Sequence, residues 1–382
     1  MRTRIVFALI AGLALGTVPR AAAAQSDLME RLSIHSSLNT GYGKSDNLQF
    51  FGIDKDGTAE YRALTLQFSY QIDDNDRVVT QFLHRYNGNS PINDVTPSFF
   101  PVWAFYEHTF DNQTKVKVGR APLPRGLFNE VRFIGTLLPF YRVGRTVYGE
   151  TLEQLDGIAV SKPFDLGSWR LETSAFGGGY DLKALLPDAN GAFVLDNRVE
   201  NSVGGQVFVN TPIDGVRVGG FFARQQVTPY YTRPEASRQE ARYNYVLSAE
   251  GVFDRAFFRG EYTQFEGVDS GEQLYNGWYT QAGVKPIAPL TIAAEYQEAT
   301  VQVDLPNPIP TIYLPMTKEL TLGVSWQTNP NIVFKFEAHR VTGYDFDSGV
   351  PTIIPPVGPP FIAGIAPASK SHYLLASIAV AF

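Results

Sequence analysis

Apolar and polar residues alternate along most of this chain. From Leu64 to Ile72 every second residue is large and apolar, and the residues between are polar. The same period of two recurs in residues 320–327 and 334–339. Side chains of a β-strand point alternately to its two faces, so this period predicts strands with one apolar and one polar face. No long segment repeats its apolar residues with a helical period.

The connections between these strands alternate in length. Seven short turn-forming segments lie near residues 73–76, 111–113, 165–168, 211–215, 254–255, 287–289 and 329–331. Eight longer segments lie near residues 43–57, 88–98, 121–155, 178–198, 226–240, 266–274, 301–316 and 341–370. Fifteen connections imply 16 strands. Short turns at one end and long loops at the other are typical of bacterial outer-membrane barrels. We therefore predict an all-β fold, a transmembrane antiparallel up-and-down β-barrel of about 16 strands.

The last residues support this interpretation. From Leu374 to Phe382 every second residue is apolar, and Leu375 alone breaks the small or polar pattern of the other face. A chain that ends in an amphipathic strand with a terminal aromatic residue resembles the outer-membrane β-barrel proteins. A soluble propeller would also alternate, but no blade motif repeats here, and a propeller explains neither the loop asymmetry nor the final Phe.

The two faces of the predicted strands have different surroundings in a barrel. Aromatic residues beside the short turns are expected to lie at the bilayer boundary, namely Tyr70, Phe110, Trp169, Phe253, Phe257 and Trp326. Charged residues would cost several kcal/mol each in the middle of the lipid, so they are expected to line a water-filled lumen. The predicted lumen wall includes Arg62, Arg85, Lys117, Arg170, Glu250, Glu261 and Glu295.

The N-terminal segment is expected to be a cleaved export signal. Arg2 and Arg4 precede a short apolar stretch, and Ala22–Ala24 fit a cleavage site. We therefore assign residues 1–24 to the signal and residues 25–382 to one barrel domain. Without the three Arg of the signal the net charge moves from −6 to −9, which argues against nucleic acid as a partner.

Residues for catalysis or metal binding form no recognisable pattern. The chain has no Cys, and its five His show no spacing typical of a metal site. No Gly-x-Ser-x-Gly motif is present. We therefore expect no metal, no cofactor and no enzymatic activity. A barrel hydrolase that uses scattered Ser and His residues is the alternative.

The third long segment is the candidate for selectivity. It spans about 35 residues between strands, and loops of that length are usually functional or disordered. Its many Leu, Phe, Val and Pro residues argue against disorder, and the barrel interior is where they could pack. From residue 120 to 145 it carries five Arg and one acid, namely Arg120, Arg125, Arg132, Arg142, Arg145 and Glu130.

These features together resemble the 16-stranded Gram-negative porins, whose third loop folds inward and narrows the pore. The stretch Val118–Arg120 with Pro124–Glu130 is similar to the start of that loop in porins of the phosphate-selective O/P type. No Lys-rich ladder accompanies it, which argues against phosphate specificity. The resemblance implies a Gram-negative outer-membrane location, contact with the lipid bilayer and lipopolysaccharide, and a homotrimer.

The expected function is a channel for passive diffusion of small hydrophilic solutes and ions. Rings of Arg favour anions in a pore, so the loop arginines could make the constriction anion-leaning. They could instead pair with wall carboxylates such as Glu250 or Glu295 and only hold the loop in place. A substrate-specific uptake channel of the same fold and a non-conducting adhesin or scaffold are the other candidate functions.

Overall fold

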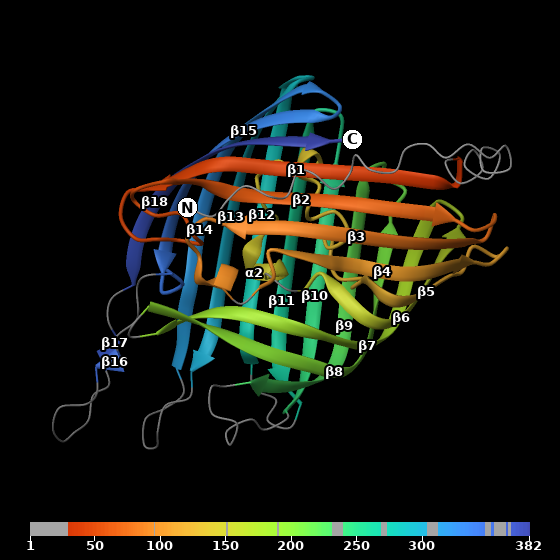
Figure 1. The fold of residues 1–382 in the computed structure, drawn as a ribbon, viewed down its shortest axis with the longest axis horizontal. Helices are drawn as coiled ribbons and strands as arrows, with labels where there is room; N and C mark the ends of the chain where they lie inside the picture. The colour runs from red at the N-terminus through yellow and green to blue at the C-terminus, as the bar shows by residue number, and fades with distance from the viewer. Residues whose placement is uncertain are drawn as a thin grey trace, which may run out of the picture.

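The chain forms one closed barrel of sixteen antiparallel strands (Figure 1). The computed structural model describes residues 30–94, 96–149, 152–188, 191–230, 240–268, 273–303, 312–347, 353–354, 364–365 and 368–382. The barrel strands are β1 (Leu32–Ser45), β2 (Thr58–Gln71), β3 (Asp76–Asn87), β4 (Phe99–Thr109), β5 (Lys115–Pro122), β6 (Gln154–Leu166), β7 (Trp169–Asp188), β8 (Gly191–Asn210), β9 (Val216–Tyr230), β10 (Glu240–Val252), β11 (Ala256–Gly267), β12 (Gln273–Ile287), β13 (Leu290–Val303), β14 (Ile312–Asn329), β15 (Ile332–Gly343) and β18 (Ser369–Ala381).

Each barrel strand pairs with its neighbours along the chain, and β18 closes the ring by pairing with β1. This confirms the predicted strand number and the up-and-down topology. Two short strands outside the barrel, β16 (Ile353–Ile354) and β17 (Gly364–Ile365), pair with each other. Residues 1–24, assigned to the export signal, lie outside the described residues.

In the described parts of the connections between strands, helical structure consists of single turns. These are η1 (Pro91–Asp94), η2 (Gly135–Leu137) and α2 (Arg145–Tyr148). Within the described residues, none of these helices has the length and apolar character needed to cross a membrane.

The short and long connections lie at opposite ends of the barrel. Ser36 near the start of β1 and Phe382 exchange backbone hydrogen bonds of 2.7 and 2.9 Å, so the start of β1 and the C-terminus lie at the short-turn end. One predicted loop is wrong, because residues 178–188 and 191–198 continue as paired strands. The pairing of β7 with β8 runs from Arg170 and Asn210 to Asp188 and Gly191, which makes a long hairpin.

The two faces of the sheet differ as the alternation predicts. On β14, β15 and β18 the outward residues Leu322, Phe336 and Leu374 are about half exposed, whereas the inward residues Lys335 and Glu337 are buried. Four aromatic residues beside the short turns, Phe110, Trp169, Phe253 and Trp326, are exposed large side chains. The apolar face therefore points outward and the polar face points into the lumen.

Phe257 departs from the expected aromatic girdle. It is buried and packs with Phe140 and Ala293. It lies on the same face of β11 as Arg259 and Glu261, which point into the lumen. The aromatic ring therefore supports the inward-folded loop rather than the bilayer boundary.

The hydrophobic core lies inside the barrel, where the third long connection (loop L3, residues 123–153) packs against the wall. Figure 1 shows α2, which belongs to this loop, within the ring of strands. Leu138 and Val147 of L3 pack with Phe221 and Val246 of the wall. A second cluster joins loop L1 (residues 46–57) to the wall and to L3, and it contains Phe50, Phe51, Tyr61, Tyr141, Tyr373 and Leu375. Leu375 is therefore inward and buried, which explains its break in the alternation.

Candidate functional site

Loop L3 is held at its start by a fully buried arginine. The Arg125 guanidinium donates hydrogen bonds to the carbonyl oxygen of Val147 at 2.6 Å and to the Thr263 hydroxyl at 2.8 Å. Its Nε donates to the Asn244 side chain at 3.3 Å. Only 1% of Arg125 is exposed. All of these acceptors are neutral, so this arginine joins L3 to the inner faces of β10 and β11.

Glu261 of β11 is a second anchor for the loop. Its carboxylate accepts hydrogen bonds from the backbone N–H of Leu127 at 2.9 Å, from Ser248 at 2.6 Å and from Tyr279 at 2.7 Å. The Tyr148 hydroxyl of α2 also donates to it. A buried carboxylate with this many donors holds its surroundings rigidly, because losing any donor leaves charge without compensation.

The far part of L3 is held by the opposite side of the barrel. Lys335 donates from Nζ to the carbonyl oxygens of Gly135 and Phe140, each at 2.7 Å. Glu337 accepts from the backbone N–H of Tyr141 at 2.7 Å. Asn39 of β1 donates to the Tyr141 carbonyl at 2.9 Å. L3 therefore spans the lumen between β10–β11 and β15–β18–β1.

A glycine of β12 lets α2 lie directly on the wall. A Cβ atom at Gly277 would be 2.2 Å from the carbonyl oxygen of Thr146, far inside van der Waals contact. The Tyr275 hydroxyl donates to the same oxygen at 2.5 Å, and Gln297 accepts from the Thr146 N–H at 3.1 Å. The short helix α2 therefore packs directly on the backbone of β12 at Gly277, with no side chain between them.

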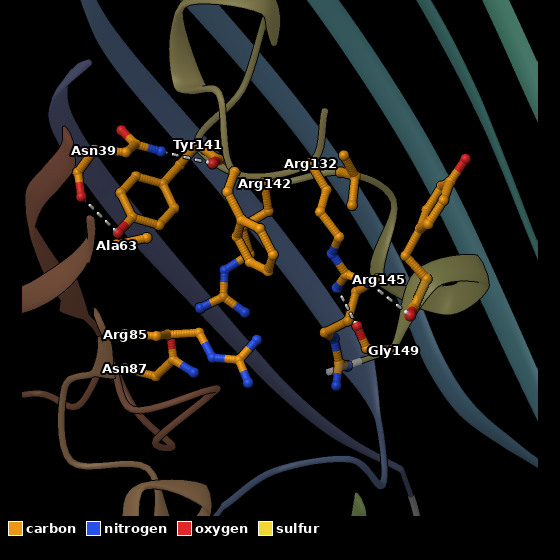
Figure 2. A pocket seen from close by; sticks show the side chains of 12 residues that line it. Asn39, Ala63, Arg85, Asn87, Arg132, Tyr141, Arg142, Arg145 and Gly149 are labelled. Carbon is orange, nitrogen blue, oxygen red and sulfur yellow. Dashed lines mark hydrogen bonds between the residues drawn. The ribbon is translucent and has the colours of Figure 1, made fainter. Parts of the chain in front are cut away.

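Four arginines gather where L3 faces the wall of β1–β3. Figure 2 shows Arg132, Arg142 and Arg145 of the loop, together with Arg85 of β3, around one space. The cavity between them has a volume of about 60 Å³. Its other lining residues are Asn39, Ala63, Asn87, Phe133, Tyr141, Val143, Tyr148 and Gly149.

Two of these arginines lie on aromatic rings of L1 and β2. The guanidinium carbon of Arg142 is 3.9 Å from the ring centroid of Phe51 and 4.8 Å from that of Tyr61. Arg145 lies over Phe50 at 4.7 Å and pairs with Asp345 at 2.5 Å. Stacking on a ring fixes a guanidinium without neutralising it. Aromatic rings therefore hold Arg142 in place, whereas Arg145 is held by a ring and a carboxylate.

The other two arginines, Arg85 and Arg132, are held by contacts with residues of L3. Arg85 forms a buried ion pair with Glu153 at 2.8 Å. Arg132 donates to the Tyr148 carbonyl at 3.2 Å and also to the carbonyl of Gly149 and the Asn129 side chain. Two carboxylates pair directly with this set, Glu153 with Arg85 and Asp345 with Arg145.

Two of the predicted site residues, Arg120 and Arg62, lie outside the lumen. Arg120 pairs with Asp156 at 2.7 Å, and both belong to the faces of β5 and β6 that carry the exposed side chains of Val118 and Ile158. Arg62 has the same parity on β2 as the exposed Leu64, and it donates to His84 at 3.0 Å. Both arginines therefore lie on the outer face. The strands β2 and β5 alternate as expected, but these two charged side chains point outward.

The remaining predicted wall residues face the lumen. Lys117 lies 3.7 Å from Glu130 of L3 and 4.0 Å from Glu107. Arg170 is 3.6 Å from Asp165. Glu250 is shared by two arginines, Arg217 at 2.6 Å and Arg259 at 2.9 Å. Glu295 is buried under L3 and accepts from Gln281 at 2.9 Å. No ion pair in the described part of the chain joins a loop arginine to Glu250 or Glu295, the partners considered above.

Sequence reasoning missed several partners of these groups. Glu153 and Asp345 lie just outside regular strands, so no alternation indicated their direction. Lys335 and Glu337 share the inward face of β15, which the period did indicate, but nothing local shows that they contact L3. Within the described residues, no three His, Asp or Glu side chains are placed to hold a metal ion.

Solved structures of outer-membrane proteins share this architecture. The outer membrane channel DcaP of Acinetobacter baumannii is similar with a TM-score of 0.55 at 12% identity, over 92% of this chain and 97% of that one. An anion-selective porin from Comamonas acidovorans gives a TM-score of 0.53 at 13% identity, over 92% and 99% of the two chains. The fold is that of the outer-membrane porins. The trimer form of OmpT from Vibrio cholerae gives a TM-score of 0.52 at 10% identity, over 92% and 99%.

The likeness to porins lies in the fold rather than in the sequence. No protein-family model matches this chain, and no curated protein matches it. The resemblance to phosphate-selective porins of the O/P type stays a prediction. The fold provides a lumen, a loop that folds into it, and a site where this loop contacts the wall.

Proposed function

We propose that this protein is an outer-membrane porin, a channel through which small hydrophilic solutes and ions diffuse passively. The observation that carries the proposal is the arginine-rich site between L3 and β1–β3. Loop L3 crosses the lumen and is fixed at both sides, so a solute must pass beside it. Arg132 and Arg142 of the loop line that site together with Arg85 and Arg145.

The outer face supports a membrane location. Its exposed side chains are apolar over most of the strand length, with aromatic residues beside the short turns. A closed sheet with an apolar exterior and a polar interior satisfies its backbone within the bilayer, where an open edge would not. We therefore place the barrel in the outer membrane of a Gram-negative cell, with the short turns facing the periplasm.

Anion preference follows from the same site. Four arginines line this site, and rings of arginine favour anions in a pore. Arg presents a fixed fork of donors to carboxylate or phosphate groups. The anion-selective porin from Comamonas acidovorans has the same fold, which supports this proposal without identifying a solute.

Trimeric assembly is a further part of the proposal. A structural neighbour, OmpT of Vibrio cholerae, has a trimer form. Light scattering of the detergent-solubilised protein tests this, and a mass of three copies is expected.

A substrate-specific uptake channel is the second candidate, and the stacked arginine favours it. Arg142 lies against Phe51 and Tyr61, so a flat anionic solute would meet charge and an aromatic surface together. Saturable block of ion conductance by one solute would support this function. A passive channel should show conductance that rises with salt concentration and no such block.

Solute flux through reconstituted protein tests the channel itself. Liposomes containing the protein should swell in small neutral sugars, and the rate should fall steeply as sugar size increases. Heat-unfolded protein in the same liposomes is the control. An intact barrel that gives neither swelling nor single-channel conductance would reject the channel and favour an adhesin or scaffold.

A further inference from the structure

A chain of hydrogen bonds runs along the inner wall of β13, β14 and β15, beneath L3. Glu337 of β15 accepts from the Tyr141 N–H of L3 at 2.7 Å, and its other carboxylate oxygen lies 3.2 Å from Nε2 of His339. Nδ1 of His339 lies 2.8 Å from one carboxylate oxygen of Glu319 on β14. The other oxygen of Glu319 accepts from the side chain of Gln297 on β13 at 2.8 Å. These wall residues are all buried.

The two ends of this chain hold two amides of the same loop segment. One end is the Tyr141 amide, and at the other end Gln297 accepts from the Thr146 N–H at 3.1 Å. Arg142 and Arg145 lie between these two amides in the sequence, and both line the arginine site (Figure 2). Because both amides depend on one chain, loss of its central member would loosen the backbone that carries the two arginines.

His339 is the central member, and its surroundings indicate the charged form of the ring. A neutral imidazole has one N–H, whereas both ring nitrogens of His339 face carboxylate oxygens. Only the imidazolium donates to Glu319 and Glu337 together. The ring also lies nearly parallel to that of Tyr373, with centroids 4.0 Å apart and an angle of 9° between the planes. The face of an aromatic ring attracts a cation.

Charged groups of several other elements surround this ring. The narrow cavity between L3 and the wall of β13–β18 has, besides His339, these titratable or charged side chains in its lining: Tyr61, Arg142, Arg145, Glu295, Glu319, Glu337 and Tyr373. Arg145 pairs with Asp345, and Glu295 accepts from Gln281. The two carboxylates at the ring nitrogens are therefore the groups that the imidazolium compensates. Without that cation they would be two neighbouring buried charges, which is strongly unfavourable.

We propose that His339, as an imidazolium, is the residue that positions Arg142 and Arg145 at the constriction. It acts through one carboxylate on the Tyr141 amide and through the other on the Thr146 amide. A neutral ring would lose one of its two bonds to the carboxylates, so the segment would be held firmly at one end only. The effect on ion passage rests on the proposed channel function, whereas the state of the ring and the hold on the two amides do not.

His84 of β3 is a matched control, because its contacts indicate the neutral form. Its Nε2 accepts from Nε of Arg62 at 3.0 Å, and its Nδ1 lies 2.6 Å from the carbonyl oxygen of Ser98. One nitrogen accepts and the other donates, as a neutral imidazole requires. His84 lies on the outer face with Arg62, so its replacement leaves the lumen unchanged.

Nitrogen NMR of the folded protein in detergent, with isotope-labelled histidine, tests the state of the ring. At pH 7.5 a histidine with an ordinary pKa of about 6.5 is mostly neutral. We expect the resonances that disappear in His339→Gln to carry protons on both ring nitrogens, and those that disappear in His84→Gln to carry one. A wild-type spectrum without any doubly protonated histidine would overturn the proposal, and this result needs neither a variant nor transport.

Amide hydrogen exchange tests the hold on the loop. In His339→Gln, exchange at Tyr141 and Thr146 should rise together by about tenfold or more. Exchange at Leu127, which Glu261 holds on the other side of the lumen, should stay as in the wild type. An equal rise at Leu127 would indicate general loosening, and unchanged exchange at Tyr141 or Thr146 would show that the chain does not hold the segment. Either result would overturn the proposal.

A second variant keeps this test valid if His339→Gln does not fold. Gln297→Met breaks the chain at one end only, so exchange at Thr146 should rise while exchange at Tyr141 stays low. A rise at both amides would contradict the proposed order of the chain.

The zero-current potential in a salt gradient links the chain to ion passage. His339→Gln should lose most of the anion preference, and His84→Gln should keep it. A loosened segment with unchanged preference would show that His339 does not position the arginines for anions. A wild type without anion preference would instead reject the proposed function, and the ring and amide measurements distinguish the two failures.

Discussion

Arg125 of L3 and Thr263 of β11 lie 138 positions apart in the chain and are joined by a hydrogen bond of 2.8 Å. The contact lies inside the barrel, where Arg125 is almost completely buried. It holds the loop in the lumen, because a charged side chain of the loop donates hydrogen bonds to acceptors of the wall. The acceptors of the wall are in place only after the barrel has closed.

Arg125→Met is expected to destabilise the folded protein by about 2–4 kcal/mol, because it leaves buried acceptors without their donor. The acceptors concerned are the Val147 carbonyl, Asn244 and Thr263. Urea unfolding in detergent, followed by tryptophan fluorescence, measures the change. Arg120→Met is the control, since Arg120 lies on the outer face. Equal midpoints for the two variants would mean that the buried contact contributes nothing.

Gly277→Ala is expected to lift α2 from the wall, because the added Cβ would be 2.2 Å from the Thr146 carbonyl oxygen. Overpacking of this kind typically costs about 1–3 kcal/mol. Single-channel recordings should show larger current noise as the loop moves. Gly220→Ala is the matched control, because the nearest atom to a Cβ there is 3.7 Å away. Low current noise in both variants would argue against direct packing of α2 on β12.

Much of this architecture can be predicted from the sequence, and the limits have physical reasons. The period of two fixes the face of each strand residue, so it already places Arg62 with Leu64 and Arg120 with Val118, on the outside. The error was to assign charge to the lumen regardless of depth. Near strand ends an outward arginine meets water and headgroups at little cost.

The loop contacts could not be predicted in this way. The sequence shows that L3 is long, apolar and rich in Arg, but not that Arg125 is an anchor while Arg142 lines the cavity. That difference depends on which wall residues the closed barrel brings opposite each position. Leu375 and Phe257 are similar cases, since each points inward because loop residues cover it.

The contact between L1 and the connection after β15 should depend on pH. Asp347 accepts hydrogen bonds from the Gly52 N–H and from Gln49, and burial raises the pKa of its carboxyl from 3.8 to about 6. Well below pH 3.8 the carboxyl is neutral in both the closed and open forms. As pH rises towards 6 the open form ionises first, so the contact loses up to about 3 kcal/mol and stays weaker above pH 6.

Amide hydrogen exchange at Gly52 and Ile53, corrected for intrinsic rates, measures this contact. Protection should be higher at pH 4.5 than at pH 8. Asp347→Asn keeps an acceptor oxygen but cannot ionise, so its protection should be the same at both values. Higher protection at pH 8 in the wild type would show that the ionised carboxylate is the stabilising form.

Glu153→Gln is expected to strengthen anion preference, because it removes the carboxylate that balances Arg85. The anion-to-cation permeability ratio should rise. Asp156→Asn removes an acid of the outer face that pairs with Arg120, and it should leave the ratio unchanged. A similar shift in both variants would indicate a general charge effect instead of a local one.

The zero-current potential across a planar bilayer in a potassium chloride gradient tests the central claim most directly. The wild-type channel should give the sign of an anion-preferring pore. The double variant Arg132→Ala with Arg142→Ala should move the potential towards zero, and Arg120→Ala should not. A cation-preferring wild type, or a potential that the double variant leaves unchanged, would contradict the assignment of the L3 arginines to the constriction.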